Sequence, residues 1–212
     1  MIAASLKGKT ILDCSSLLPG PFVGKLLAEL GARVLKIESP TRRDPGMQMA
    51  NGAFYEDLNS MKELVLQDWS TPEGRTEFEK LVREADGLIE AFRPATKRKW
   101  GLDSATLHAI NPKLCIASLR GYPEGHPWAE RAGHNLNFEA VTGVLSLFSE
   151  MPPLPLADLL GAYDAALRLA AALGTGQGAV ISVSLAESLE RVQSGLALEF
   201  KKTSTAPTPG TH

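Results

Sequence analysis

Two short segments of the sequence carry side chains that could transfer a proton or attack a carbonyl group. The first is Gly133-His134-Asn135, which places an imidazole next to a glycine at the predicted start of a helix. In the second, residues 156–161, a single carboxylate, Asp158, lies among apolar neighbours. An imidazole and a carboxylate that face one pocket can act as general acid and base, and a carboxylate alone can act as a nucleophile.

Each segment also has a plain structural interpretation. A single histidine is commonly a hydrogen-bonded structural group, and an aspartate at the start of a helix is commonly an N-cap. The helix dipole would keep such an aspartate ionised, because it favours negative charge at this end of a helix. Either segment alone therefore leaves His134 and Asp158 open between a chemical and a structural role.

A second group of residues could bind a ligand that carries phosphates. Gly20 lies in a Pro-Gly-Pro turn before a predicted helix, where a ligand could approach the backbone closely and meet free N–H groups. Cations are supplied by Lys36 and the run 97–99, although a run of this kind is also typical of a solvated helix face. The sequence contains no GxGxxG motif, so a dinucleotide-binding site is not predicted.

The composition excludes several classes of partner. The 212 residues are 44% hydrophobic and 22% charged, and 22 basic and 24 acidic residues give a formal net charge of −2, so nucleic acid and anionic membrane surfaces are not expected partners. Cys14 and Cys115 lie in apolar stretches without a CxxC motif, which indicates core residues rather than a metal site. No run of 18 apolar residues and no signal peptide are found, so we expect a cytoplasmic protein.

Apolar, β-branched runs alternate with amphipathic helical stretches, which predicts an α/β fold with a parallel sheet covered by helices. The predicted strands are residues 10–15, 33–38, 64–66, 87–90, 114–119 and 179–184. The predicted helices are residues 22–30, 72–85, 104–110, 136–148 and 158–173, with another after the last strand. Residues 201–212 hold almost no apolar side chains, and we expect a disordered tail there.

Six segments together resemble the N-terminal part of the family III CoA-transferase and α-methylacyl-CoA racemase (CaiB/BaiF) family, in order and roughly in spacing. They are GPFVGKLLAELGARVLKIESP, LIEAFRP, LDSATLHAINPKL, RAGHNLNFEAVTGVL, PLADLLGAYDAAL and GTGQGAVISVSL. The resemblance covers residues 6–189. It implies a Rossmann-like large domain at residues 1–200, an acyl-CoA substrate with coenzyme A as part of it, no permanently bound cofactor, and a homodimer of interlocked chains.

The resemblance also implies roles for single residues. In racemase members, a histidine in a Gly-His-Asp segment and an aspartate in a Leu-Ala-Asp segment are the acid and base, and these positions fall on His134 and Asp158. Transferase members use the position of Asp158 as a nucleophile and usually lack the histidine, so His134 favours racemisation at the α-carbon of a 2-methylacyl-CoA. The residues expected to contact CoA are Arg93, Gly133, Asn135, Gly20 and Lys36.

Several departures from the family pattern keep two alternatives open. Asn135 stands where racemases carry an aspartate, and Ser39 stands where they often carry an arginine that pairs with a CoA phosphate. The connection before residue 174 is short, and the chain ends soon after its last predicted helix, where full-length members continue into a small domain. A CoA-transferase that works through an aspartyl-CoA intermediate is one alternative. A non-catalytic CoA-binding relative, or one completed by another chain, is the other.

Overall fold

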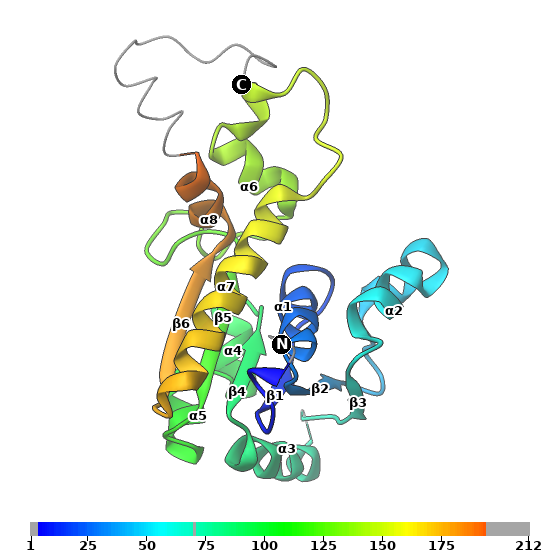
Figure 1. Cartoon of the computed structure of the whole chain (residues 1–212), viewed down its shortest axis with the longest axis vertical. Coiled ribbons are helices and arrows are strands. Elements are labelled where there is room, and N and C mark those ends of the chain that lie inside the picture. The colour runs from blue at the N-terminus through cyan, green and yellow to red at the C-terminus, as the bar shows by residue number, and fades with distance from the viewer. Residues whose placement is uncertain (1–3, 70, 194–212) are drawn as a thin grey trace.

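Short apolar strands build a six-stranded sheet at the centre of the computed structural model, which describes residues 4–69 and 71–193 (Figure 1). The strands are β1 (Thr10–Asp13), β2 (Arg33–Glu38), β3 (Glu63–Leu66), β4 (Gly87–Glu90), β5 (Cys115–Arg120) and β6 (Ala179–Ser184). All pairs are parallel, and the order is β3-β2-β1-β4-β5-β6. This is the order of a Rossmann-type doubly wound sheet, so the predicted α/β fold is confirmed.

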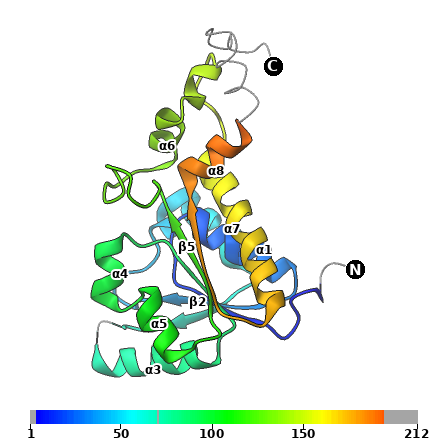
Figure 2. The same cartoon turned by 90° about the vertical axis from the view of Figure 1, so that its left-hand side faces the viewer.

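Helices cover both faces of the sheet, because successive side chains of a strand point to opposite sides. Ile11 packs in the core beneath α1 (Pro19–Glu29) and α7 (Leu156–Thr175). Its neighbour Leu12 packs in the core beneath α3 (Pro72–Glu84) and α5 (Ser104–Ile110). Figure 2 shows the two helical layers on either side of the sheet. The sheet is therefore buried on both faces, as its continuous apolar strands predict.

Several helix ends follow from the local sequence, and others differ from the prediction. The Thr71 hydroxyl accepts a hydrogen bond from Gly74 N at the start of α3, as expected of an N-cap. The predicted Pro-Gly-Pro turn is instead the first turn of α1, where a proline costs no hydrogen bond. The helix predicted over residues 136–148 is split, because Gly143 has a φ of 79°. Its two parts are α6 (Asn135–Val141) and the 3₁₀ helix η3 (Val144–Leu147).

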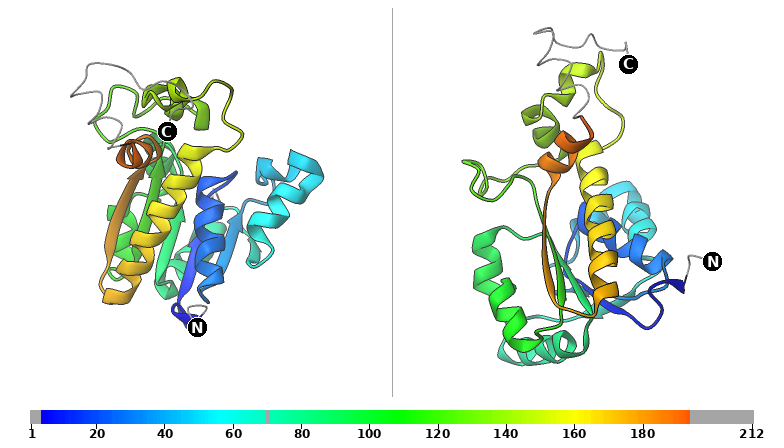
Figure 3. Two further views of the ribbon diagram at one scale, coloured as in Figure 1. Left: turned by 45° about the horizontal axis from the view of Figure 1, so that its top comes forward. Right: turned by 60° about the vertical axis from the view of Figure 1, so that its left-hand side comes forward.

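Four further elements complete the described chain. Three were not predicted: the 3₁₀ helix η2 (Pro45–Gly52), α2 (Ala53–Asn59) and α4 (Pro94–Trp100). The predicted last helix is α8 (Leu185–Val192). Figures 1 and 3 show α6 beyond the carboxyl ends of β5 and β6. We therefore expect the ligand-binding site at this end of the sheet, where ligands bind in open α/β folds.

The tail predicted at residues 201–212 lies outside the described residues. Within the part that the structure describes, no helix is long and apolar enough to cross a membrane. The cytoplasmic location stays a prediction.

Candidate active site

A cavity of about 780 Å³ opens at the carboxyl ends of β1, β4 and β5. Its lining includes Arg93, Gly133, His134 and Asp158, which are four of the seven residues predicted to form the site. The strand order explains the position of the cavity, because the connections from β1 and β4 leave the sheet in opposite directions and open a crevice between them.

The side chain of Asn135 joins the two helices that carry His134 and Asp158. Its Oδ1 atom accepts hydrogen bonds from the backbone N–H of Ala157 at 2.9 Å and of Asp158 at 3.3 Å. His134 precedes Asn135 as the N-cap residue of α6, and its own backbone N–H donates to Asn137 Oδ1 at 2.8 Å. The start of α6 is thus held against the start of α7. The predicted contact of Asn135 with CoA is not supported, since its side chain binds α7 and does not line the cavity.

Glycines allow the loops of the cavity to pack closely on α6. A Cβ atom added to Gly133 would lie 2.7 Å from the ring of Phe138, and one added to Gly121 would lie 2.3 Å from the same ring. Phe138 is buried. Gly133 lines the cavity, and its lack of a side chain is also required for packing on Phe138.

Asp158 differs from the expectation of an ionised N-cap. The N-cap residue of α7 is Pro155, and Asp158 is the third residue of the helix. Burial, and after it the negative charge of the nearby Glu139, raise the pKa of Asp158 from 3.8 to about 6. Loss of hydration therefore outweighs the helix dipole, which would favour the carboxylate. A carboxyl with this pKa can both take up and release a proton near neutral pH.

Lys36 was predicted to contact a phosphate, but the structure pairs it with buried protein groups. Its side chain is 1% exposed, lies 3.3 Å from Asp44 Oδ2 and 4.0 Å from Asp13 Oδ2, and donates to the carbonyl of Ser15. Lys62 also pairs with Asp13, at 2.8 Å. Burial alone would raise the pKa of Asp13, but the two lysines lower it to about 2. Lys36 therefore stabilises the loop after β1, and its charge is paired with carboxylates of the protein.

Gly20 also packs against protein groups. It is buried in the first turn of α1, and a Cβ atom added there would lie 2.2 Å from Ser15 Cβ. The structure therefore gives this glycine a packing role, because it lets α1 begin directly against the loop after β1.

Gly20→Ala is expected to destabilise the protein by about 1–3 kcal/mol, the usual cost of overpacking a core. Urea denaturation measures the free energy of unfolding of the variant. Gly174→Ala is the matched control, since its Cβ atom would meet nothing within 4 Å in helix α7, and it should raise stability by up to ~1 kcal/mol. Equal stability of the two variants would contradict the close packing at Gly20.

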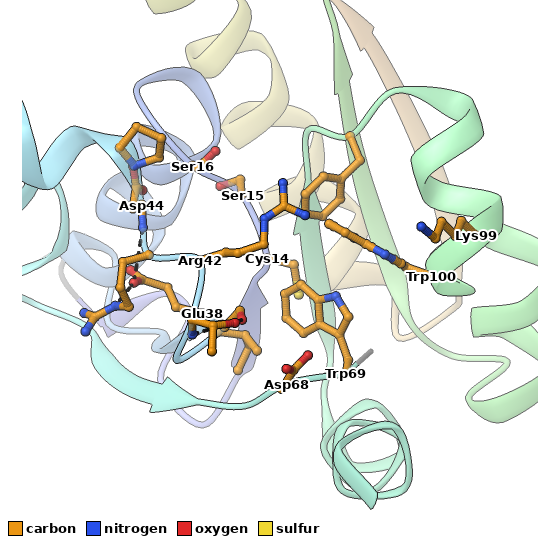
Figure 4. Close-up of a pocket in the computed structure, with 16 residues that line it drawn as sticks. Cys14, Ser15, Ser16, Glu38, Arg42, Asp44, Asp68, Trp69, Lys99 and Trp100 are labelled. Atoms are coloured by element: carbon orange, nitrogen blue, oxygen red, sulfur yellow. Dashed lines mark hydrogen bonds and ion pairs between the residues drawn. The ribbon is translucent and has the colours of Figure 1, made fainter. Parts of the chain in front are cut away.

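A second cavity of about 430 Å³ adjoins the first, and Ser16 and Phe92 line both. Figure 4 shows Arg42 extending into it opposite Trp100 and Lys99. Trp69 completes an aromatic wall, with ring centroids 6.0 Å from Trp100. The sequence reasoning included Lys99 in the run 97–99 but missed Arg42, Trp69 and Trp100, although Arg42 and Trp69 both follow the carboxyl ends of strands.

The run at residues 97–99 is not a uniformly solvated face. Lys97 Nζ lies 2.8 Å from Glu90 Oε1 and 2.9 Å from Ser118 Oγ, and Glu90 is fully buried. Lys99 lines the second cavity, whereas Arg98 is exposed. The structural and the ligand-binding interpretation of this run thus apply to different residues.

Metal-ligating side chains do not gather in the described residues. No group of three or more His, Cys, Asp or Glu side chains there could hold a metal ion. Cys14 and Cys115 are both buried and free, as predicted for core residues. Cys14 also contributes to the wall of the second cavity.

The family model described as CoA-transferase family III matches residues 6–212. The chain belongs to CoA-transferase family III. This family III chain is 32% identical over 209 residues to the succinyl-CoA–D-citramalate CoA-transferase of Chloroflexus aurantiacus, covering 91% of the chain and 52% of that protein. It is 31% identical over 203 residues to the human α-methylacyl-CoA racemase, covering 91% of the chain and 51% of the racemase.

The fold of the family III chain also matches a solved structure. The crystal structure of a CaiB/BaiF family protein from Brucella suis superposes with a TM-score of 0.91 at 29% identity, covering 97% of this chain and 60% of that one. The chain spans about half the length of the curated relatives it matches. Transferases and a racemase are thus both among its relatives.

Proposed function

We propose that the family III chain binds acyl-CoA thioesters and racemises or epimerises the α-carbon of a 2-methylacyl-CoA, with His134 and Asp158 as acid and base. The observation that carries this proposal is that the two side chains come from different helices and line the same cavity. The half-buried carboxyl of Asp158, with its pKa of about 6, suits proton transfer near neutral pH.

Inversion needs one proton to leave and another to return on the opposite face. One of the two groups removes the α-hydrogen as a proton, and the electron pair of the C–H bond passes to the thioester carbonyl to form an enolate. The other group then delivers a proton to the opposite face of the α-carbon. For one enantiomer the base is His134, and for the other it is Asp158. Cations of the cavity, such as Arg93, are available to offset the developing negative charge.

The two adjoining cavities suit the two ends of a CoA thioester. The larger one holds the proposed acid and base, so it would take the acyl group. The smaller one offers Arg42 and Lys99 for phosphates, and Trp69 and Trp100 for a flat aromatic base. The pantetheine arm would pass between them at Ser16 and Phe92, which line both cavities.

His134→Gln tests the two-base assignment. Inversion of either enantiomer of 2-methylacyl-CoA is expected to fall by about 100-fold or more. Incorporation of deuterium from D₂O without inversion should persist for the enantiomer whose hydrogen faces Asp158. Chiral chromatography and mass spectrometry measure the two events separately.

His108→Gln is the matched control for this substitution. The His108 ring is hydrogen-bonded to the carbonyl of Leu114, 2.9 Å away, and does not line the cavity. Its inversion rate should stay within about twofold of wild type. Inversion by His134→Gln at the wild-type rate, or wild-type protein without exchange on several thioesters, would refute the racemase assignment.

A CoA-transferase is the second candidate, because a named CoA-transferase is among the relatives and Asp158 presents a carboxylate to the cavity. In that reaction the carboxylate attacks the thioester, releases the thiolate of CoA and forms a mixed anhydride; the thiolate then returns to give an aspartyl-CoA thioester and a free acid. Hydroxylamine should trap the activated carboxyl of Asp158 after incubation with a donor. Intact-mass spectra without an adduct for any donor would remove this candidate.

A partner-dependent relative is the third candidate, because the alpha and beta subunits of the Chloroflexus aurantiacus succinyl-CoA–L-malate CoA-transferase are among the relatives. The segment from α6 to the start of α7 also exposes several large apolar side chains, namely Leu136, Val141, Phe148, Met151 and Leu154. A homodimer, interlocked or not, or a complex with another chain would bury them. A strictly monomeric chain that is active alone would exclude this candidate.

A further inference from the structure

Glu139 is a buried acidic residue that the proposed reaction does not use. It lies in α6 and is fully buried. Its Oε1 atom accepts hydrogen bonds from Asn135 Nδ2 at 2.7 Å and from the backbone N–H of Leu156 at 2.9 Å. Its Oε2 atom is buried without a hydrogen-bond partner among the described residues. A charge buried with one oxygen unpaired costs free energy, so its presence calls for a physical explanation.

The first turn of α7 depends on α6 for its hydrogen bonds. The N-cap residue, Pro155, offers no side-chain acceptor. Glu139 accepts from the N–H of Leu156 instead, and Asn135 accepts from the two that follow. These three donors are among the four that a helix cannot satisfy internally. Because Asp158 belongs to this turn, the contacts with α6 determine where its carboxyl group lies.

Among the charged groups near Asp158, Glu139 is the acidic one that affects its pKa. The basic groups that share the cavity with Asp158 are Arg93, Arg120, Arg131 and His134. Arg120 pairs with Glu124 at 3.2 Å, and Arg131 lies over the ring of Trp128. Further along α7, Asp164 is paired with Arg168 and with Arg191 of α8. Burial is the largest cause that raises the pKa of Asp158, and the negative charge of Glu139 is the second.

We propose that Glu139 is a positioning residue for Asp158. Glu139 fixes the first turn of α7 through Leu156 and Asn135, and it places a negative charge near the Asp158 carboxyl. The inference deepens the proposed function, since it explains how the suggested acid and base of one cavity is held and kept protonatable. Glu139 itself lies outside the cavity lining.

Glu139→Gln separates the charge from the hydrogen bonds. Glutamine has the same size and keeps an oxygen that can accept from the N–H of Leu156, but it carries no charge. Titration of the carboxyl ¹³C signal of Asp158 by NMR needs neither substrate nor activity. The pKa of Asp158 is expected to fall by about one unit, the effect of removing a like charge several ångströms away at an effective dielectric near 20.

Glu190→Gln is the matched control, because Glu190 is exposed on α8, a helix that packs against α7. It should leave the pKa of Asp158 within about 0.2 units of wild type. An unchanged pKa in Glu139→Gln would overturn the proposal. If the wild-type protein shows the raised pKa but exchanges no α-hydrogen, the proposed function fails while the positioning role stands.

Hydrogen exchange tests the proposal on the wild-type protein, so this test does not depend on whether a variant folds. The amides of Leu156 and Ala157 should exchange at least about 100-fold more slowly than free peptide, because both donate to buried acceptors on α6. Unprotected exchange of both would also overturn the proposal. In an active enzyme, Glu139→Gln should move the acidic limb of the pH–rate profile to lower pH, whereas a purely structural role would lower the rate at every pH alike.

Discussion

Asp158→Asn is expected to reduce α-hydrogen exchange of a 2-methylacyl-CoA by about 1,000-fold, within the 10²–10⁴ range of general acid–base catalysis. The carboxamide has the same shape as the carboxyl, but it can neither take up nor release a proton at neutral pH. Binding should change by less than about threefold, because a carboxyl with a pKa of about 6 is close to neutral in mildly acidic buffer. Deuterium incorporation and calorimetric titration with the thioester measure the two quantities separately.

Asp164→Asn is the matched control on the same helix. Asp164 lies between one and two turns further along α7 and is paired with Arg168 at 2.7 Å, away from the cavity lining. Its exchange rate should stay within about twofold of wild type. A rate above one tenth of wild type in Asp158→Asn would exclude this carboxyl as the acid or base.

The pH dependence follows from the direction of the pKa shift. A folded-state pKa of about 6 lies above the ordinary value of 3.8, so Asp158 is ionised only at a pH above about 6. For the enantiomer that needs Asp158 as base, kcat/KM should therefore fall as the pH drops through about 6. The same raised pKa makes ionisation of Asp158 unfavourable for folding, so its contribution to stability is greatest when the carboxyl is protonated and is lost as the pH rises through 6.

Lys36→Met is expected to destabilise the fold by about 3–5 kcal/mol, because it removes one partner of a buried ion pair and leaves charge behind. The Asp44 carboxylate, 2% exposed, would lose its cation at 3.3 Å. Asp44 also accepts from the N–H of Leu17, which has a φ of 64°, so the loop after β1 would be loosened as well. Urea denaturation followed by circular dichroism measures the free energy of unfolding.

Lys80→Met is the matched control, because it makes the same substitution in an exposed ion pair. Lys80 lies 2.6 Å from Glu77, and both side chains are more than half exposed, so the change should cost less than about 1 kcal/mol. If Lys36 served a phosphate instead, its variant would unfold at the same urea concentration as Lys80→Met and would differ in affinity for CoA alone.

Much of the fold could be predicted because strands and helices follow local side-chain patterns. The strands β2 and β6 were predicted to the residue, since each is a short apolar run between polar turns. The single helix expected over residues 136–148 was wrong, because its helical composition does not reveal that Gly143 adopts a left-handed conformation. The residues of η2 also escaped prediction, as they contain backbone outside the helical region at Met49, Ala50 and Asn51.

The candidate site was predicted in part, and the errors have one physical source. Arg93, His134 and Asp158 were found from their motifs and line one cavity. Lys36 and Asn135 were assigned to the ligand although both are occupied by protein groups. A cation or an amide in a strand or helix start has the same local sequence whether its partner is a ligand or a buried residue. The partner comes from another part of the chain.

By itself, the sequence determined the alternation of strands and helices, the α/β class and the presence of a histidine and an aspartate in two family motifs. These depend on neighbouring residues and on their order. Only the tertiary structure decided which of these side chains reach the cavity and how readily Asp158 binds a proton. Burial and a nearby like charge set that property, and the charge of Glu139 acts on Asp158 only because α6 packs across the start of α7.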